Sequence, residues 1–212
     1  MVEDAILNSG SAINLDKNLR AEKKRLRQDF KSKRLAISAA QRMHTAEAIA
    51  QQLTKLPEWL PANYIAGYWA TDGEVPLHIV QMRVQPPKVW CLPIVQPDKT
   101  LKFSPWRSGD PLVSNQYGIP EPDISPTSAL DASGMSIILL PLLAYTRSGA
   151  RLGMGGGYYD RSLAFRHAQS APPLLIGIAY SSQEADELPC EAWDIKLDML
   201  INEREVLRFK YA

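Results

Sequence analysis

A glycine-rich segment, residues 151–161, is the part of the chain best suited to hold an anion. Its sequence is RLGMGGGYYDR, and four of the five residues from Gly153 to Gly157 are glycine. Glycine destabilises a fold unless the backbone needs a left-handed conformation or a close approach to a ligand. An apolar run at 137–144 predicts a buried strand before the segment, and residues 158–168 predict a helix after it. A strand, a glycine loop and a helix in this order predict a phosphate site, because N–H groups and the helix dipole face the anion.

The segment nevertheless matches neither of two common phosphate-binding sequences. No Gly-Lys-Ser/Thr follows the glycines, and Tyr158 stands where a dinucleotide fingerprint starting at Gly153 needs its third glycine. A tight turn between strand and helix is therefore an alternative explanation of the glycines. Arg151 and Arg161 flank the loop and could bind phosphate oxygens through paired hydrogen bonds, unless they are ordinary surface arginines.

Acidic residues offer a candidate magnesium site. Mg²⁺ prefers one or two carboxylates together with phosphate oxygens. Asp160 falls in the first turn of the predicted helix, where an acid also complements the helix dipole. Asp194 or Asp198, four residues apart, could supply a second carboxylate, and the alternative is that both are solvated acids in a connection.

Composition limits the class of protein. The chain has 212 residues, of which 45% are hydrophobic and 22% charged, and this predicts one domain with a full core. A net charge of +1 gives no overall field toward nucleic acid or membrane, and no apolar run approaches the roughly 20 residues that span a bilayer. The two cysteines form no CxxC pair, and the three histidines have no zinc-ligand spacing. We expect a cytoplasmic protein, taken as a monomer, with no nucleic-acid or membrane partner.

Positive charge is concentrated in one predicted helix, residues 16–37. Residues 17–34 contain nine Lys/Arg and two Asp/Glu, a local excess of +7. Four apolar residues share one face of this helix, and three cations lie beside them. The apolar residues are Leu19, Leu26, Phe30 and Ile37, and the cations are Lys23, Arg27 and Arg34. The pattern is compatible with a solvated surface helix, with an anion-binding helix, or with a nucleic-acid-binding module.

The remaining pattern predicts an α/β fold with three layers, α/β/α, around a mainly parallel sheet, because strands alternate with helices. A capping box at Ser38 and Gln41 begins a second predicted helix that ends near Leu56. A short helix is predicted at 76–84, and residues 108–126, with four prolines, are predicted to form a loop. Predicted strands occupy 63–70, 88–95, 99–106, 137–144, 174–180, 197–201 and 206–211. We expect a single domain at 16–212, preceded by a weakly ordered extension at 1–15.

Glu74 follows the predicted strand at 63–70, much as the glycine-rich segment follows the strand at 137–144. Open α/β sheets bind ligands beyond the carboxyl ends of their strands, so Glu74 and the glycines are predicted to share one crevice. Trp69, Tyr117 and Tyr158 lie in or near these loops and could hold a flat heterocycle, although most aromatic residues belong to a core. An alternative role for Glu74 is to act as the catalytic base of a sugar-phosphate isomerase.

Five segments, in order, resemble the 5-formyltetrahydrofolate cyclo-ligase family, over about residues 20–203. They are the basic helix at 23–38, Tyr68 with Glu74, residues 117–122 (YGIPEP), the glycine-rich segment, and residues 188–198. The resemblance implies that ATP and 5-formyltetrahydrofolate give 5,10-methenyltetrahydrofolate, ADP and phosphate. It also implies that the formyl oxygen takes the γ-phosphoryl group before N10 of the folate attacks the activated carbon.

The resemblance further implies a role for each site residue. ATP would be bound by Lys23, Lys24, Arg25, Leu26, Arg27, Arg151, Leu152, Gly153, Met154, Gly155, Gly156, Gly157, Tyr158 and Tyr159. The folate would be bound by Arg27, Trp69, Glu74, Tyr117, Met154, Gly155, Gly156, Gly157 and Tyr158. Arg151 and Tyr158 would be catalytic, and Asp160 and Asp194 would bind Mg²⁺. Met154 and Trp193 depart from the family pattern, in which a larger or charged residue and a histidine often occupy these positions.

Overall fold

The computed structural model describes residues 2–124 and 128–209, with side chains described from residue 17 onward. The helices are α1 (Val2–Leu35), α2 (Ala39–Thr54), α3 (His78–Met82) and α4 (Tyr158–Ser162). Short 3₁₀ helices are η1 (Pro57–Trp59), η3 (Ala132–Gly134), η4 (Ala164–His167) and η5 (Ser181–Gln183). The strands are β1 (Tyr64–Ala66), β2 (Val89–Val95), β3 (Leu101–Pro105), β4 (Leu112–Ser114), β5 (Pro120–Pro122), β6 (Ile137–Pro141), β7 (Ala144–Tyr145), β8 (Arg151–Leu152), β9 (Leu174–Ile178), β10 (Met199–Ile201) and β11 (Val206–Arg208).

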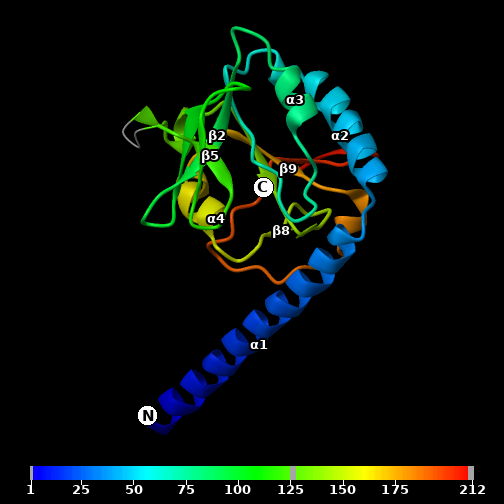
Figure 1. Ribbon diagram of the computed structural model, residues 1–212. Helices are drawn as coiled ribbons and strands as arrows, with labels where there is room; N and C mark the ends of the chain where they lie inside the picture. Colours follow the sequence, from blue (N-terminus) through cyan, green and yellow to red (C-terminus); the bar gives the residue numbers. More distant parts are fainter. Residues whose placement is uncertain (1, 125–127, 210–212) are drawn as a thin grey trace.

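The centre of the molecule is a seven-stranded sheet in the order β11-β10-β9-β6-β1-β2-β3. The five inner strands are parallel to one another, and β11 and β3 close the two edges in antiparallel orientation. In Figure 1, α2 and α3 lie on one side of this sheet and α4 lies on the other. The predicted three-layer fold with a mainly parallel sheet is therefore confirmed.

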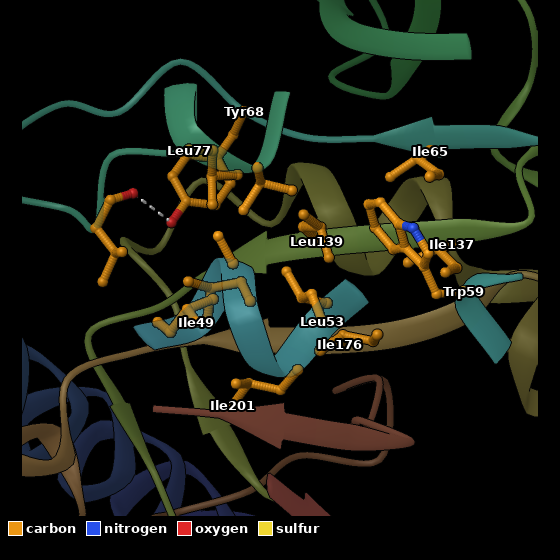
Figure 2. Packing of buried hydrophobic residues seen from close by; sticks show 14 of the residues in the cluster. Ile49, Leu53, Trp59, Ile65, Tyr68, Leu77, Ile137, Leu139, Ile176 and Ile201 are labelled. Atoms are coloured by element: carbon orange, nitrogen blue, oxygen red, sulfur yellow. Dashed lines mark hydrogen bonds between the residues drawn. The ribbon is translucent and has the colours of Figure 1, made fainter. Parts of the chain in front are cut away.

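The central position of β6 in the sheet explains why its sequence is continuously apolar. Its first four residues are all buried, because the strand packs on both faces of the sheet. Leu139 belongs to the cluster with Ile49 and Leu53 of α2, which Figure 2 shows from close by. Leu140 faces the opposite cluster, which contains Leu163 beyond α4. The capping box predicted for α2 is also present, with Gln41 N–H donating to Ser38 Oγ at 3.3 Å.

The basic helix is longer than predicted. α1 begins at Val2 instead of Asp16 and ends at Leu35, and no proline interrupts it. In Figure 1 its first part extends away from the body, whereas its last turns lie against the sheet layers. Phe30 is buried there with Leu143 and Leu152. The weak order predicted for residues 1–15 stays a prediction, and residue 1 lies outside the described residues.

Two predicted elements are divided by turns. The run at 137–144 ends as a strand at Pro141, and the chain then forms the β7–β8 hairpin, so the glycines at 153–157 follow β8 instead of the long strand. Gly149, in the turn of this hairpin, has a φ of 85°, which favours glycine. The helix predicted at 158–168 is likewise divided at Leu163 into α4 and η4.

The loop predicted at 108–126 is wrong in its central part, where β4 and β5 form an antiparallel hairpin. Asn115 is the reason, because its side-chain oxygen accepts hydrogen bonds from the N–H groups of Tyr117 (2.9 Å) and Ile119 (3.1 Å). Residues 125–127 lie outside the described residues, as do residues 210 and 211 of the predicted terminal strand. Among the helices that the structure describes, none is both long enough and apolar enough to cross a bilayer.

Candidate active site

A cavity of about 1130 Å³ lies beyond the carboxyl ends of β1, β2 and β6. Its walls come from the second half of α1, the segment after β1, the β4–β5 hairpin, the glycine-rich segment, α4 and residues 191–194. Glu74 and all five residues of Gly153–Gly157 line it, so they share one crevice as predicted. The parallel topology explains this placement, because the carboxyl ends of adjacent strands meet at one edge of the sheet.

Three cations of α1 face the protein interior. Lys23, Arg27 and Arg34 follow each other at spacings of four and seven residues, which places them on one side of a helix. Lys23 is 6% exposed and Arg34 is 1% exposed. Arg27 Nε donates to the carbonyl oxygen of Gly153 at 3.0 Å. By contrast, Arg25 is exposed and pairs with its own helix neighbours, so the predicted site residues of α1 do not all line the cavity. Lys24, Arg25 and Leu26 lie outside its lining.

Lys23, Glu191 and Asp194 form a group that we call the Lys23 cluster. Lys23 Nζ donates to Glu191 Oε2 at 2.5 Å and to Asp194 Oδ2 at 2.9 Å. Asp194 Oδ2 also accepts from the main-chain N–H of Glu191 at 2.9 Å, which fixes the turn. Burial alone would lower the pKa of Lys23, but its bonds to the two carboxylates outweigh burial and raise that pKa. The cluster combines one cation with two carboxylates, so its formal net charge is −1.

The glycines allow the loop to pack against two arginines. Gly155 and Gly157 have φ angles of 97° and 66°, in the left-handed region. A Cβ atom on Gly155 would lie 3.2 Å from the guanidinium carbon of Arg27, and one on Gly157 would lie 2.9 Å from an Arg161 nitrogen. The glycines therefore serve a close approach as well as a turn. The predicted contribution of a helix dipole is small, because α4 spans only five residues.

Arg151 and Asp160 link the loop to α4 and to the C-terminal segment. The two side chains form an ion pair, and that of Arg151 is almost fully buried. Arg151 Nε donates to the Ile195 carbonyl at 3.1 Å, and Asp160 Oδ1 accepts from the Ile195 N–H at 3.2 Å. Both side chains line the cavity. The main chain of Ile195 therefore fixes the position of both side chains, which also face the cavity.

Arg34, Asp72 and Glu74 form a second group, which we call the Arg34 cluster. Arg34 donates from Nε to the carbonyl oxygen of Asp72 at 3.0 Å, and its NH1 lies 3.5 Å from Glu74 Oε1. Glu74 Oε2 accepts from the main-chain N–H of Thr71 at 3.0 Å. Burial raises the pKa of Glu74, and the opposing effects of Thr71 and Arg34 do not cancel that rise.

Aromatic side chains complete the walls. The hydroxyl groups of Tyr117 and Tyr158 lie 2.5 Å apart, and their rings meet edge to face with centroids 5.9 Å apart. This bond joins the β4–β5 hairpin to the start of α4, and it raises the pKa of Tyr158. Trp69 is held edge to face against Trp106 at 6.0 Å. Trp69, Tyr117 and Tyr158 all line the cavity, and their role in holding a heterocycle stays a prediction.

Sequence reasoning assigned no site role to Arg34 or Glu191. The spacing of Arg34 from Lys23 and Arg27 was an available signal for the first, whereas Glu191 is recognised only through its contact with Lys23. The structure also separates the two acids offered as the second metal ligand. Asp194 lines the cavity, whereas Asp198 binds Arg166 at 2.7 Å and does not line it.

Whether a magnesium ion could bind in the cavity depends on the carboxylates that line it. Among the described residues, no group of three or more His, Cys, Asp and Glu could hold a metal ion by itself. Asp160, Asp194 and Glu191 nevertheless line the cavity with partly exposed carboxylates. Mg²⁺ often takes only one or two carboxylates and completes its shell with phosphate oxygens and water. The residues therefore suit an ion that binds together with a nucleotide.

Sequence comparison places this site among known proteins. The model of the 5-formyltetrahydrofolate cyclo-ligase family matches residues 19–203. The chain is 32% identical to the 5-formyltetrahydrofolate cyclo-ligase of Haemophilus influenzae over 184 residues, which cover 85% of this chain and 97% of that protein. It is 29% identical to the enzyme of that name in Escherichia coli (strain K12) over 181 residues, covering 84% and 98%.

Solved structures agree with the sequence match. An NMR structure of Aquifex aeolicus 5,10-methenyltetrahydrofolate synthetase superposes with a TM-score of 0.77 at 32% identity, covering 90% of this chain and 94% of the other. A structure of the 5,10-methenyltetrahydrofolate synthetase from Mycoplasma pneumoniae gives a TM-score of 0.65 at 26% identity, covering 86% and 99%. The chain therefore belongs to the 5-formyltetrahydrofolate cyclo-ligase family of ligases.

Proposed function

We propose that the protein uses ATP and Mg²⁺ to convert 5-formyltetrahydrofolate into 5,10-methenyltetrahydrofolate, with release of ADP and phosphate. The observation that carries the proposal is the single cavity in which inward-facing cations of α1, the glycine-rich segment and the buried Glu74 lie together. Cations and main-chain N–H groups suit a polyphosphate. A carboxylate suits the N–H pair of a pterin ring.

On the nucleotide side, Lys23, Arg27 and the glycine-rich segment are proposed to bind the phosphates of ATP. Asp160 and Asp194 are proposed to hold Mg²⁺, which when bound neutralises charge on the phosphate oxygens. Lys23 then exchanges its carboxylate partners for phosphate, since both kinds of partner are oxyanions. This exchange is supported by the placement of Lys23, Glu191 and Asp194 at the wall of one cavity.

On the folate side, Glu74 is proposed to accept the pterin N–H pair, with Trp69 and Tyr117 against the ring. The formyl oxygen attacks the γ-phosphorus and ADP leaves, after which N10 attacks the activated carbon and phosphate leaves. Such a reaction requires positioning and charge stabilisation more than covalent chemistry by the protein. Arg151 is proposed to stabilise the transferring phosphoryl group, and the Tyr158 hydroxyl is proposed to orient the formyl group.

The test is an assay of the purified protein with 5-formyltetrahydrofolate, in which turnover is measured both as methenyl absorbance and as release of ADP. We expect both signals to require ATP and to disappear when EDTA removes Mg²⁺. Methenyl formation without ATP would contradict the proposal, and so would the absence of both signals. The isomerase alternative predicts ATP-independent turnover of a sugar phosphate instead. The nucleic-acid alternative is weakened because Lys23, Arg27 and Arg34 are engaged inside the protein.

A further inference from the structure

Arg34 is a buried cation that the proposed mechanism does not use. Its side chain is 1% exposed and reaches from α1 to the segment 71–75. Its NH1 donates to the Leu142 carbonyl at 3.2 Å, in addition to the contacts of Nε with Asp72 and of NH1 with Glu74. A fully buried arginine is costly unless its donors are satisfied, and these contacts supply acceptors for Nε and NH1. The burial of this charge next to Glu74 therefore needs a functional explanation.

We propose that Arg34 is a positioning residue that keeps the Glu74 carboxylate ionised and oriented toward the pterin ring of the folate. The proposal rests on the proposed function, because it assigns the pterin to Glu74. It concerns a residue that acts through Glu74 and does not itself line the cavity.

The geometry separates the two oxygens of Glu74. Oε2 is fixed by the N–H of Thr71 at 3.0 Å, and Oε1 faces NH1 of Arg34 at 3.5 Å. Only the ionised carboxylate can accept two N–H groups with both oxygens, because a protonated carboxyl turns one oxygen into a donor. A neighbouring cation favours the ionised form, which burial opposes. Arg34 is itself held by two main-chain carbonyls, so the backbone determines where its charge lies.

The other charged and titratable groups around Glu74 keep their charge near neutral pH. Burial raises the pKa of Tyr68 and Tyr159, and it raises the pKa of Tyr180 to about 12, so all three stay neutral. Lys31 lowers the pKa of Asp72, which stays ionised. Arg42 is a further cation near this turn, close to Gly73.

The experiment compares the pH dependence of KM in three variants, Arg34→Gln, Arg34→Lys and Lys31→Gln. We expect Arg34→Gln to raise KM for 5-formyltetrahydrofolate about tenfold at neutral pH, the usual cost of losing a bond to a charged group, with little change in KM for ATP. KM for the folate should also begin its acid-side rise at a higher pH than in the wild type. His167 also lines the cavity, but it is present in the wild type and in every variant. Any effect of this histidine on the pH dependence of KM therefore cancels when a variant is compared with the wild type.

Lys31→Gln is the matched control. Lys31 lies on the same helix, but its side chain is 40% exposed and its ion pair is with Asp72, at 2.8 Å, instead of Glu74. It removes the same formal charge near the same turn, and we expect the wild-type pH profile. Arg34→Lys keeps the charge but loses the planar fork, so KM for the folate should rise while the acid-side rise stays at its wild-type pH.

Two results would overturn the inference. One is a folded Arg34→Gln protein with the wild-type pH profile of KM. If that variant does not fold, an unchanged KM for the folate in Arg34→Lys is the other. A wild-type protein without ATP-dependent turnover would instead refute the proposed function, and the inference with it.

Discussion

The two charged clusters of the cavity are held in different ways. The difference lies in the cations, because Asp194 accepts a main-chain N–H just as Glu74 does. Lys23 donates to the side-chain carboxylates of Glu191 and Asp194. In the Arg34 cluster, the backbone holds the cation. Arg34 donates to two main-chain carbonyls, and Glu74 accepts a main-chain N–H.

This difference separates exchangeable charges from preorganised ones. Ion pairs between side chains at a cavity wall can be replaced by a phosphate or a metal ion without moving the backbone. Groups fixed by the backbone keep their geometry before and after a ligand binds, which reduces the cost of ordering on binding. Under the proposed function, the Lys23 cluster changes partners during turnover, whereas the Arg34 cluster keeps its partners.

The largest effect is expected for Lys23→Met, which removes the cation of the exchangeable cluster. We expect kcat/KM for ATP to fall about 100-fold or more, the range typical for loss of one hydrogen-bond donor to negative charge that develops in the transition state. Direct binding of 5-formyltetrahydrofolate, measured by calorimetry, should stay close to the wild-type value. Equal losses for ATP and for the folate would show that the two clusters are not separate.

A smaller effect is expected for Asp160→Asn. Turnover should need more Mg²⁺, with the half-maximal concentration raised about tenfold or more, while circular dichroism shows a folded protein. Asp198→Asn is the matched control, since Asp198 binds Arg166 and the N–H of Leu175 outside the cavity. The control should melt earlier without a change in Mg²⁺ dependence. An unfolded Asp160→Asn protein would instead assign Asp160 to holding Arg151 and the start of α4.

The preorganised cluster predicts a pH dependence of stability. Because burial raises the pKa of Glu74 above 4.5, the folded state holds this proton more tightly than the unfolded state. The protonated Glu74 therefore adds to the free energy of unfolding, measured relative to the Glu74→Gln variant. This added stability is fully present below pH 4.5 and is lost as the pH rises through the pKa of Glu74 in the folded state. Thermal melting of both proteins across this interval checks the sign. A difference that stays constant with pH would contradict it.

The smallest effect is expected outside the cavity. Arg208 pairs with Glu58 at 2.6 Å through partly exposed side chains. Arg208→Gln should lower the free energy of unfolding by about 0–1 kcal/mol, the usual range for such pairs, and leave turnover unchanged. Denaturant unfolding measures it. A loss as large as that of a buried pair would mean that exposure does not distinguish surface pairs from those of the cavity.

Local patterns were sufficient to predict the sheet, and the rule that ligands bind beyond the carboxyl ends of parallel strands then placed Glu74 and the glycines in one crevice. The apolar run of β6, the capping box at Ser38 and the glycines at 153–157 each have a cause within a few residues. Contacts between distant segments were not predictable in this way. Nothing near Glu191 in the sequence indicates that its partner is Lys23, and nothing near Glu74 indicates Arg34.

Turns limited the prediction of boundaries for a similar reason. The β7–β8 hairpin depends on Gly149 and on pairing with only two residues per strand, which gives no detectable alternation. The β4–β5 hairpin depends on one asparagine side chain within a segment whose prolines favour a loop. The oligomeric state and the cellular location are not determined by these patterns and stay predictions from the sequence.

The unbroken α1 helix has a consequence for the pair of ligands. Lys23 and Arg34 are eleven residues apart on it, so at about 1.5 Å per residue their Cα atoms differ by about 16 Å along the axis. One inserted residue between Arg27 and Arg34 would rotate Arg34 by about 100° and move it away from Glu74. The separation between the proposed phosphate and pterin sites is therefore a property of helix length, and the loops around the cavity need not define it.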